Sequence, residues 1–268
     1  MVISEREVSD ALRDADVAMH RLEARLLCEH AQSSGESIDA LLSRRLGGEP
    51  IAYITGEWEF YSLPIRVTRD TLIPRADTET LAERAIEWLR ERKTRDVPMV
   101  LDLCSGTGCI GLAIAANVPS ASVTLGELSD GAIEVCRENI ALNGLGECVA
   151  VQRLNALGDV DGSVKYDLIV SNPPYIRAAE MATLDASVRE FEPRMALDGG
   201  DDGLMFYRAI AKRWRCALKT GGRLMFEVGY DQAEQVAAIL RENGYENIAV
   251  TRDLSKIERV IEGEKRNG

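Results

Sequence analysis

The sequence has few of the residues that bind transition metals. It contains only two histidines, His20 and His30, and none of its six cysteines forms a Cys-x-x-Cys pair. Structural zinc is held by clusters of histidine and cysteine, so this scarcity argues against a zinc site. We therefore expect no bound metal, reduced thiols, and histidines that serve at the surface or in helix packing.

Long apolar runs and an excess of positive charge are also missing. No apolar run reaches the roughly 18 residues that cross a bilayer, and the first residues lack the pattern of a signal peptide. We therefore expect a cytoplasmic protein without a membrane partner. The formal net charge of −12 repels a phosphate backbone, so direct nucleic-acid binding is not expected, although a local basic patch would be compatible with it. An acidic surface would suit a basic partner.

The pattern from Val97 onward alternates strands and helices, which predicts an α/β fold with a doubly wound, Rossmann-like parallel sheet. Strands are expected at Met99–Leu103, Ser122–Leu125, Val149–Gln152, Leu168–Val170 and Arg223–Val228. Helices are expected at Gly108–Asn117, Asp130–Asn143, Leu204–Leu218 and Gln232–Asn243. A closing antiparallel pair is expected at Ile248–Thr251 and Glu258–Ile261.

The residues before this sheet divide into a helical unit at 1–46 and a β-hairpin linker at 47–68, which leaves 69–268 as the large domain. In the helical unit, apolar residues recur at alternating intervals of four and three positions, which predicts that they share one helical face. They are Val8, Leu12, Ala15, Met19, Leu22 and Leu26. Ser33, Ser34 and Gly35 interrupt the pattern, and it resumes at Ile38, Leu41, Leu42 and Leu46. After Gly47, Gly48 and Pro50 end the helix, the alternation of Trp58, Phe60 and Leu63 predicts the hairpin.

A helix is also expected directly after the loop at residues 71–79. Pro74 keeps Ile73 extended, and Asp77 or Thr78 is expected to cap this helix. Its apolar residues are Leu81, Ala85, Ile86 and Leu89. Arg75 lies in the loop before the cap, where it is either an ordinary surface residue or part of the mouth of a site.

A glycine-rich turn follows the first strand of the sheet. Gly106, Gly108 and Gly111 fit the fingerprint G-x-G-x-x-G, and Glu127 ends the next strand at the distance expected for binding ribose hydroxyls. This pattern leaves two cofactors open, NAD and S-adenosylmethionine. Asp102 favours S-adenosylmethionine over NAD, because a carboxylate there would repel the pyrophosphate of NAD and attract the ammonium group of S-adenosylmethionine.

The second motif is the sequence Asn172-Pro173-Pro174-Tyr175, directly after the apolar strand. The prolines fix a stiff, extended turn at the carboxyl end of the strand, where open α/β sheets bind ligands. We expect the Asn172 side-chain oxygen and the Pro173 carbonyl to accept hydrogen bonds from a planar NH2 group, with Tyr175 packed beside it. Such a pair would place the nitrogen of this NH2 group for in-line methyl transfer without an early general base.

These motifs, in this order, resemble those of class I S-adenosylmethionine methyltransferases that act on planar NH2 groups. Three flanking stretches, at residues 48–56, 71–75 and 191–197, narrow the resemblance to the peptide chain release factor N5-glutamine methyltransferase family. The resemblance covers residues 45 to 268. It implies a methyltransferase domain at 69–268, a substrate-docking helical domain at 1–46, and methyl transfer to the glutamine of the Gly-Gly-Gln motif in class 1 release factors.

The motifs and the resemblance together assign residues to roles. Cofactor binding is assigned to Asp102, Cys104, Ser105, Gly106, Thr107, Gly108, Glu127, Asn155 and Asn172. The catalytic and substrate-binding residues are Asn172, Pro173, Pro174 and Tyr175, and Arg75 is added on the substrate side. Two features depart from the family: the helical domain has lost about a helix near Ser33–Ser37, and Asn155 stands where an aspartate beside the adenine is common.

Three other functions compete with this hypothesis. An adenine-N6 or other nucleic-acid amino methyltransferase would use the same turn, but the net charge of −12 disfavours it. A non-catalytic S-adenosylmethionine-binding module would not need the intact Asn-Pro-Pro-Tyr turn. An NAD-dependent oxidoreductase is disfavoured by Asp102.

Overall fold

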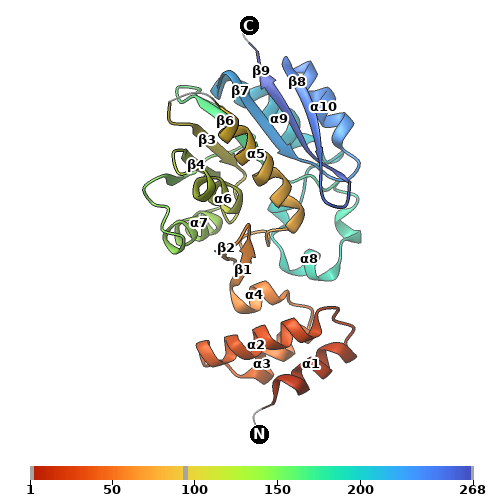
Figure 1. Ribbon diagram of the computed structural model, residues 1–268. Coiled ribbons are helices and arrows are strands. Elements are labelled where there is room, and N and C mark those ends of the chain that lie inside the picture. The colour runs from red at the N-terminus through yellow and green to blue at the C-terminus, as the bar shows by residue number, and fades with distance from the viewer. Residues whose placement is uncertain (1–2, 93–95, 267–268) are drawn as a thin grey trace.

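One seven-stranded sheet organises the chain (Figure 1), of which the computed structural model describes residues 3–92 and 96–266. Its strands are β3 (Met99–Leu103), β4 (Ser122–Glu127), β5 (Val149–Arg153), β6 (Tyr166–Ser171), β7 (Leu218–Glu227), β8 (Tyr245–Arg252) and β9 (Glu258–Lys265). They lie in the order β5-β4-β3-β6-β7-β9-β8. The first five strands in this order are parallel, and β9 is antiparallel to both of its neighbours. The predicted α/β fold, with its closing antiparallel pair, is confirmed.

Helices cover both faces of this sheet. One layer contains α5 (Glu79–Glu91), α6 (Cys109–Asn117) and α7 (Asp130–Leu142); the other contains α9 (Met205–Arg213), the 3-10 helix η4 (Trp214–Ala217) and α10 (Ala233–Glu242). Successive residues of β6 alternate between the two cores: Leu168 and Val170 pack on the first layer and Ile169 on the second. This alternation explains why β6 is apolar throughout, since both of its faces are buried.

The N-terminal helices have a core of their own. They are α1 (Glu5–Asp14), α2 (His20–Ser34), α3 (Ile38–Leu46) and α4 (Ile51–Thr55). Their buried apolar residues are Val8, Leu12, Ala24, Leu27, Leu41, Leu42, Ile51 and Ile54. The antiparallel hairpin of β1 (Glu57–Phe60) and β2 (Leu63–Arg66) lies between these helices and the sheet (Figure 1).

The single helical face expected from Val8 to Leu26 was wrong. The chain turns between α1 and α2, where Asp16 has a left-handed backbone with a φ of 59°. Val8 and Leu12 are fully buried, whereas Met19 is 57% exposed and Leu22 is 38% exposed. The regular spacing therefore runs across two separate helices, and the apolar periodicity does not reveal the turn between them.

Two element boundaries in the structure differ from those expected from the sequence. The helix expected to reach Leu218 ends at Arg213 and continues as η4, and β7 begins at Leu218 instead of Arg223. Five short elements of the described chain were not expected: α4, α8 (Ala186–Phe191), and the 3-10 helices η1 (Ala76–Thr78), η2 (Met181–Thr183) and η3 (Arg194–Ala196). Each is too short for its periodicity to be read from the sequence. Residues 1–2 and 267–268, at the outer ends of the predicted domains, lie outside the described residues, and the boundaries at 46 and 68 stay predictions.

Two contacts hold the linker in place. The Asn139 side chain accepts a hydrogen bond from the Arg66 amide (2.6 Å) and donates to the carbonyls of Arg66 and Thr107 (both 3.0 Å). The buried Tyr53 hydroxyl donates to the Thr71 carbonyl (2.6 Å). The first contact joins the hairpin to the glycine-rich turn, and the second positions the loop that carries Arg75. Among the residues that the structure describes, no helix is long and apolar enough to cross a membrane.

Candidate functional site

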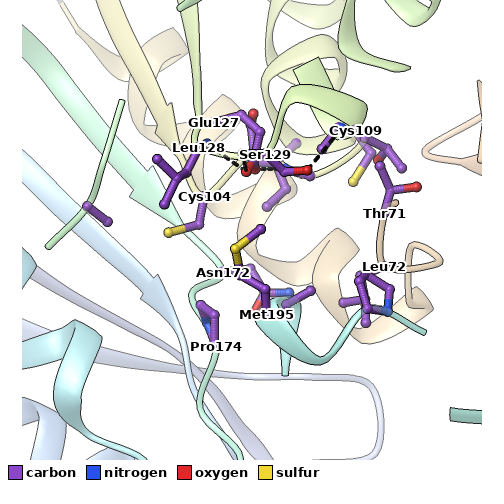
Figure 2. Close-up of a pocket in the computed structure, with 18 of the residues that line it drawn as sticks. Thr71, Leu72, Cys104, Cys109, Glu127, Leu128, Ser129, Asn172, Pro174 and Met195 are labelled. Atoms are coloured by element: carbon purple, nitrogen blue, oxygen red, sulfur yellow. Dashed lines mark hydrogen bonds between the residues drawn. The ribbon is translucent and has the colours of Figure 1, made fainter. Parts of the chain in front are cut away.

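A cavity lies at the carboxyl ends of β3, β4 and β6, where ligands bind in open α/β sheets. The predicted site residues that line it are Arg75, Cys104, Ser105, Gly106, Thr107, Glu127, Asn155, Asn172 and Pro174. Asp102, Gly108, Pro173 and Tyr175 lie outside this lining. Figure 2 shows Asn172, Pro174 and Met195 on one side of the cavity and Glu127, Leu128 and Ser129 on the other. The two motifs found in the sequence thus face a common space.

The glycine-rich turn joins β3 to α6 through a left-handed backbone. Gly108, at the N-terminus of α6, has a φ of 81°, and a Cβ there would lie 2.7 Å from Leu125 Cδ1. A glycine is therefore required at this position for both conformation and space. Cys104 has a φ of 62° although it is not glycine, and this strained residue at the strand end was not expected from the sequence.

Asp102 is fully buried beneath this turn. Its Oδ2 accepts a hydrogen bond from the Gly111 amide (2.9 Å), and its Oδ1 has no partner in the part of the chain that the structure describes. Burial raises the pKa of Asp102 to about 7, against the effect of the Gly111 hydrogen bond. An orphaned buried carboxylate oxygen would be stabilised by a cation bound near the turn, as the ammonium group of S-adenosylmethionine would be.

Glu127 binds the turn from the end of β4. Its Oε2 accepts a hydrogen bond from the Gly106 amide (2.8 Å), and its Oε1 accepts from the amides of Leu128 (2.7 Å) and Ser129 (3.0 Å). Figure 2 draws this carboxylate at the cavity wall. A carboxylate has about four lone-pair sites, so Glu127 can still accept from ligand hydroxyls while it holds the turn.

The two cysteines beside the turn are unsuited to nucleophilic catalysis. Burial raises the pKa of Cys104 and Cys109 well above its ordinary value, so both remain protonated thiols. Both were expected to be packing residues, and Cys104 was also assigned to cofactor binding. In the described residues there is no group of three or more histidines, cysteines or carboxylates that could hold a metal ion.

Asn155 lines the cavity between Leu154 and Ala156. Its side-chain oxygen accepts a hydrogen bond from the Leu157 amide (2.9 Å), which forms a local turn of the kind that asparagine favours. The remaining NH2 group is the part of this side chain that could contact an adenine ring.

The Asn172 side chain contacts Thr78, and nothing in the sequence had indicated that these two residues lie together. Its Nδ2 donates a hydrogen bond to the Thr78 hydroxyl oxygen (3.4 Å), which comes from the 3-10 helix η1 (Ala76–Thr78). Thr78 is the N-cap residue of α5, but its side chain makes no capping hydrogen bond. In the described residues, no group donates to the Asn172 Oδ1 or to the Pro173 carbonyl.

Tyr175 packs against the core that the sheet forms with α9, η4 and α10. It lies beside the turn and does not line the cavity. Burial raises its pKa to about 12, so its hydroxyl stays protonated. Its backbone carbonyl accepts a hydrogen bond from Gln232 Nε2 (3.0 Å).

A second chain segment, at residues 197–203, supports the catalytic turn from behind. Ile176 donates its amide hydrogen to the Leu197 carbonyl (2.9 Å) and accepts one from the Gly199 amide (2.8 Å). A Cβ at Gly203 would lie 2.4 Å from the Tyr175 carbonyl oxygen. This close approach was not expected, because nothing local to residues 197–203 indicates what packs against them.

We predict that Gly203→Ala slows methyl transfer at least tenfold while changing cofactor affinity little. The new methyl group would displace the Tyr175 carbonyl and shift the turn that carries Asn172. Gly221→Ala is a matched control: Gly221 also has a positive φ (74°), but its Cβ would meet nothing within 4 Å. Both variants should lose stability in thermal unfolding from their positive φ, Gly203→Ala more because of its added clash, and equal activity in the two would contradict the support role.

Arg75 is paired rather than free. Its Nη2 contacts Oε1 of the buried Glu192, and Glu192 Oε2 has no partner among the described residues. Burial raises the pKa of Glu192, against the positive charge of Arg75. The pair joins the loop at 71–75 to the stretch at 191–197, two of the three flanking stretches noted in the sequence.

Several residues that line the cavity were not assigned to the site from the sequence. They are Asp70, Thr71, Leu72, Pro74, Thr78, Cys109, Ile110, Leu128, Ser129, Ala132, Leu154, Ala156, Pro193, Met195, Ala196 and Phe206. Many of them are apolar, as expected for a wall that packs on a flat ring. Pro193, Met195 and Ala196 belong to the stretch at 191–197, which the sequence had already connected with the family. Their individual contacts with the cavity could not be predicted from it.

Comparison with known proteins agrees with this geometry. Residues 84–193 match the family model described as Methyltransferase small domain. The release factor glutamine methyltransferase of Bordetella pertussis is 40% identical over 267 residues, which is 93% of this chain and 96% of that protein. The Fusobacterium nucleatum protein of the same name is 42% identical over 227 residues, and the match spans 85% of this chain but only 63% of the relative.

Solved structures share the fold at low sequence identity. The hMettl16 catalytic domain, in complex with MAT2A 3'UTR hairpin 6, aligns with a TM-score of 0.61 at 16% identity, over 85% of this chain and 82% of that one. A methyltransferase from Pyrococcus furiosus aligns with a TM-score of 0.53 at 16% identity, over 84% of this chain and 98% of that one. At such identities the likeness concerns the fold alone.

Proposed function

The chain belongs to the release factor glutamine methyltransferase family, and from this premise we propose that it methylates the side-chain amide nitrogen of the glutamine in the Gly-Gly-Gln motif of class 1 release factors. The enzyme is an S-adenosylmethionine-dependent methyltransferase. The observation that carries the substrate proposal is the position of Asn172, which lines the same cavity as the glycine-rich turn. We place the reaction in the cytoplasm, where translation terminates.

The residues of the cavity suit the methyl donor. Asp102 offers a buried negative charge under the turn, and Glu127 offers a carboxylate at the end of β4. We assign the ammonium group of the cofactor to the first of these and the ribose hydroxyls to the second. Backbone groups at Cys104–Gly108 and the Asn155 side chain complete the assigned binding set. When bound, S-adenosylmethionine supplies a methyl group on a positively charged sulfur that a nucleophile can displace.

Asn172 and Pro173 act on the amide of the substrate. An amide nitrogen is a poor nucleophile because its lone pair is shared with the carbonyl group. The Asn172 Oδ1 and the Pro173 carbonyl accept the two N–H groups of the glutamine, which holds the nitrogen in place and favours lone-pair density on it. No general base is required before transfer, because the proton becomes acidic only as the N–C bond forms and the S–C bond breaks, and it then passes to solvent water.

The route for a protein substrate is supported by a second cavity. It lies between the N-terminal helices and the hairpin, and its lining includes Leu22, Leu26 and Trp58. Pro74 and Arg75 line both cavities, so a polypeptide bound in the second could extend a loop into the first. We propose that the release factor lies along this groove, and that Arg75 marks the point where its loop enters the site.

The experiment that tests this function uses labelled S-adenosylmethionine. The enzyme should transfer label to a class 1 release factor, and mass spectrometry should locate one methyl group on the glutamine of its Gly-Gly-Gln motif. A release factor with alanine in place of that glutamine is the control and should take up no label. Label in duplex DNA or RNA, with none in the release factor, would instead identify a nucleic-acid amino methyltransferase.

A further inference from the structure

Behind Asn172 lies a buried acid that the proposed reaction does not use. Glu227, at the end of β7, is 1% exposed, and its Oε2 has no partner in the described part of the chain. A buried carboxylate usually has a full set of hydrogen bonds or a direct ion pair. Glu227 has neither, so its position calls for an explanation.

Thr78 lies between Glu227 and the catalytic turn. It is 2% exposed, and its hydroxyl lies close enough to Glu227 to lower the pKa of that carboxyl. The same hydroxyl oxygen accepts the hydrogen bond from Asn172 Nδ2. Thr78 therefore stands between the acid and the catalytic amide.

A hydroxyl has a single proton, and this fixes the direction of the contacts. If Thr78 donates its proton to the Glu227 carboxylate, its oxygen can only accept a hydrogen bond from Asn172. The NH2 end of the Asn172 amide must then face Thr78, which leaves Oδ1 directed away from it as the acceptor for the substrate. The reversed amide is nearly identical in shape, but it would present N–H groups to the N–H groups of the substrate.

We infer that Glu227 and Thr78 are positioning residues that set the orientation of the Asn172 side-chain amide for methyl transfer. The inference rests on the proposed function for its catalytic consequence, but the orientation itself is a property of this chain. It also gives a role to a buried acid whose Oε2 has no partner in the described part of the chain.

Within residues 3–92 and 96–266, no charged group forms an ion pair with Glu227. Arg259 of β9 lies close enough to lower its pKa, but its guanidinium contacts Asp77 (3.0 Å) and Asp253 (3.2 Å) instead. Asp77 of η1 opposes this effect, and Arg75 adds to it. The other titratable groups that sense Glu227 are Tyr175, Tyr207 of α9 and Cys109 of α6.

The arrangement makes the orientation depend on pH. Burial raises the pKa of Glu227 to about 7, although the nearby Thr78 hydroxyl lowers it. Above this pH the carboxylate is ionised and draws the Thr78 proton. Below it, the protonated acid can donate to Thr78, whose own proton is then free for Asn172 Oδ1, and the reversed amide becomes competitive. The rate constant for transfer should therefore rise with pH through about 7.

Four enzymes test the inference: the wild type, Thr78→Val, Thr78→Ser and Glu227→Gln. With release factor as substrate, Thr78→Val should lower kcat about tenfold or more, and Thr78→Ser, which keeps the hydroxyl, should restore most of it. Glu227→Gln should flatten the pH profile of kcat near 7. Calorimetry should show the dissociation constant for S-adenosylmethionine within about threefold of wild type in all four.

A measurement without methyl transfer separates this inference from the proposed function. The 15N–1H signals of the Asn172 side-chain NH2 group, assigned by their loss in Asn172→Ala, should shift with an apparent pKa near 7 in the wild type and not in Glu227→Gln. Failure of the wild type to methylate release factor would overturn the proposed function and leave this titration as the test of orientation. Signals that titrate identically in both proteins would overturn the inference, as would full activity in Thr78→Val.

Discussion

Replacing Asn172 with alanine is expected to lower kcat for release-factor methylation by about a thousandfold and to leave S-adenosylmethionine binding nearly unchanged. The variant loses the acceptor that holds one N–H group of the substrate amide, while the Asp102, Gly106 and Glu127 contacts of the cofactor turn remain intact. Single-turnover kinetics at saturating release factor measures the first effect, and calorimetry the second.

Asn117→Ala is a suitable control for that experiment. Asn117 lies at the end of α6, where its Nδ2 donates to the Ala113 carbonyl (3.0 Å), far from the turn in sequence and outside the cavity lining. It should lose a little stability and keep full activity. If calorimetry instead showed that Asn172→Ala no longer binds S-adenosylmethionine, the assigned catalytic role would be wrong.

Asp102→Ala is expected to act on the cofactor first, raising its dissociation constant by about 10- to 100-fold. The substitution removes both the acceptor for the Gly111 amide and the buried negative charge under the turn. Because burial raises the pKa of Asp102 to about 7, the carboxylate ionises only as pH rises past that value. Wild-type affinity for the positively charged cofactor should therefore increase between about pH 6 and 8.

Asp102→Asn separates the two contributions. Its side-chain oxygen can still accept from Gly111, but it carries no charge at any pH. We expect intermediate affinity and no pH dependence in calorimetry between about pH 6 and 8. At saturating cofactor, kcat should be restored to near the wild-type value in both variants. If Asp102→Ala bound the cofactor as tightly as the wild type at every pH, the carboxylate would have no role in binding.

The sheet and the two motifs could be predicted because their signals are local. The apolar residues of β6, buried on both faces, and the prolines that follow Asn172 act within a few residues of each other. The same holds for Gly106 and Gly108 after β3. These features place the cofactor turn and the catalytic turn at one edge of a parallel sheet without knowledge of any distant contact.

The support of the site could not be predicted in the same way. Thr78 and Asn172 are 94 positions apart, and a threonine before a helix is normally explained as its cap. Gly203 is required only because the Tyr175 carbonyl lies against it. Asp102 lies beneath the turn rather than in the cavity lining, and this burial, which raises its pKa, is not visible in the sequence. Such facts depend on how the layers pack, which local patterns do not encode.

The order of the strands has a consequence for synthesis on the ribosome. β9 lies between β7 and β8, although it follows both of them in the chain. A nascent chain that has emerged only as far as β8 therefore leaves the hydrogen-bonding edge of β7 open. Arg259 of β9 also supplies the contact to Asp77, the neighbour of Thr78. Completion of the catalytic wall should therefore await β9, and the enzyme should acquire methyl-transfer activity only after residues 258–265 have left the exit tunnel.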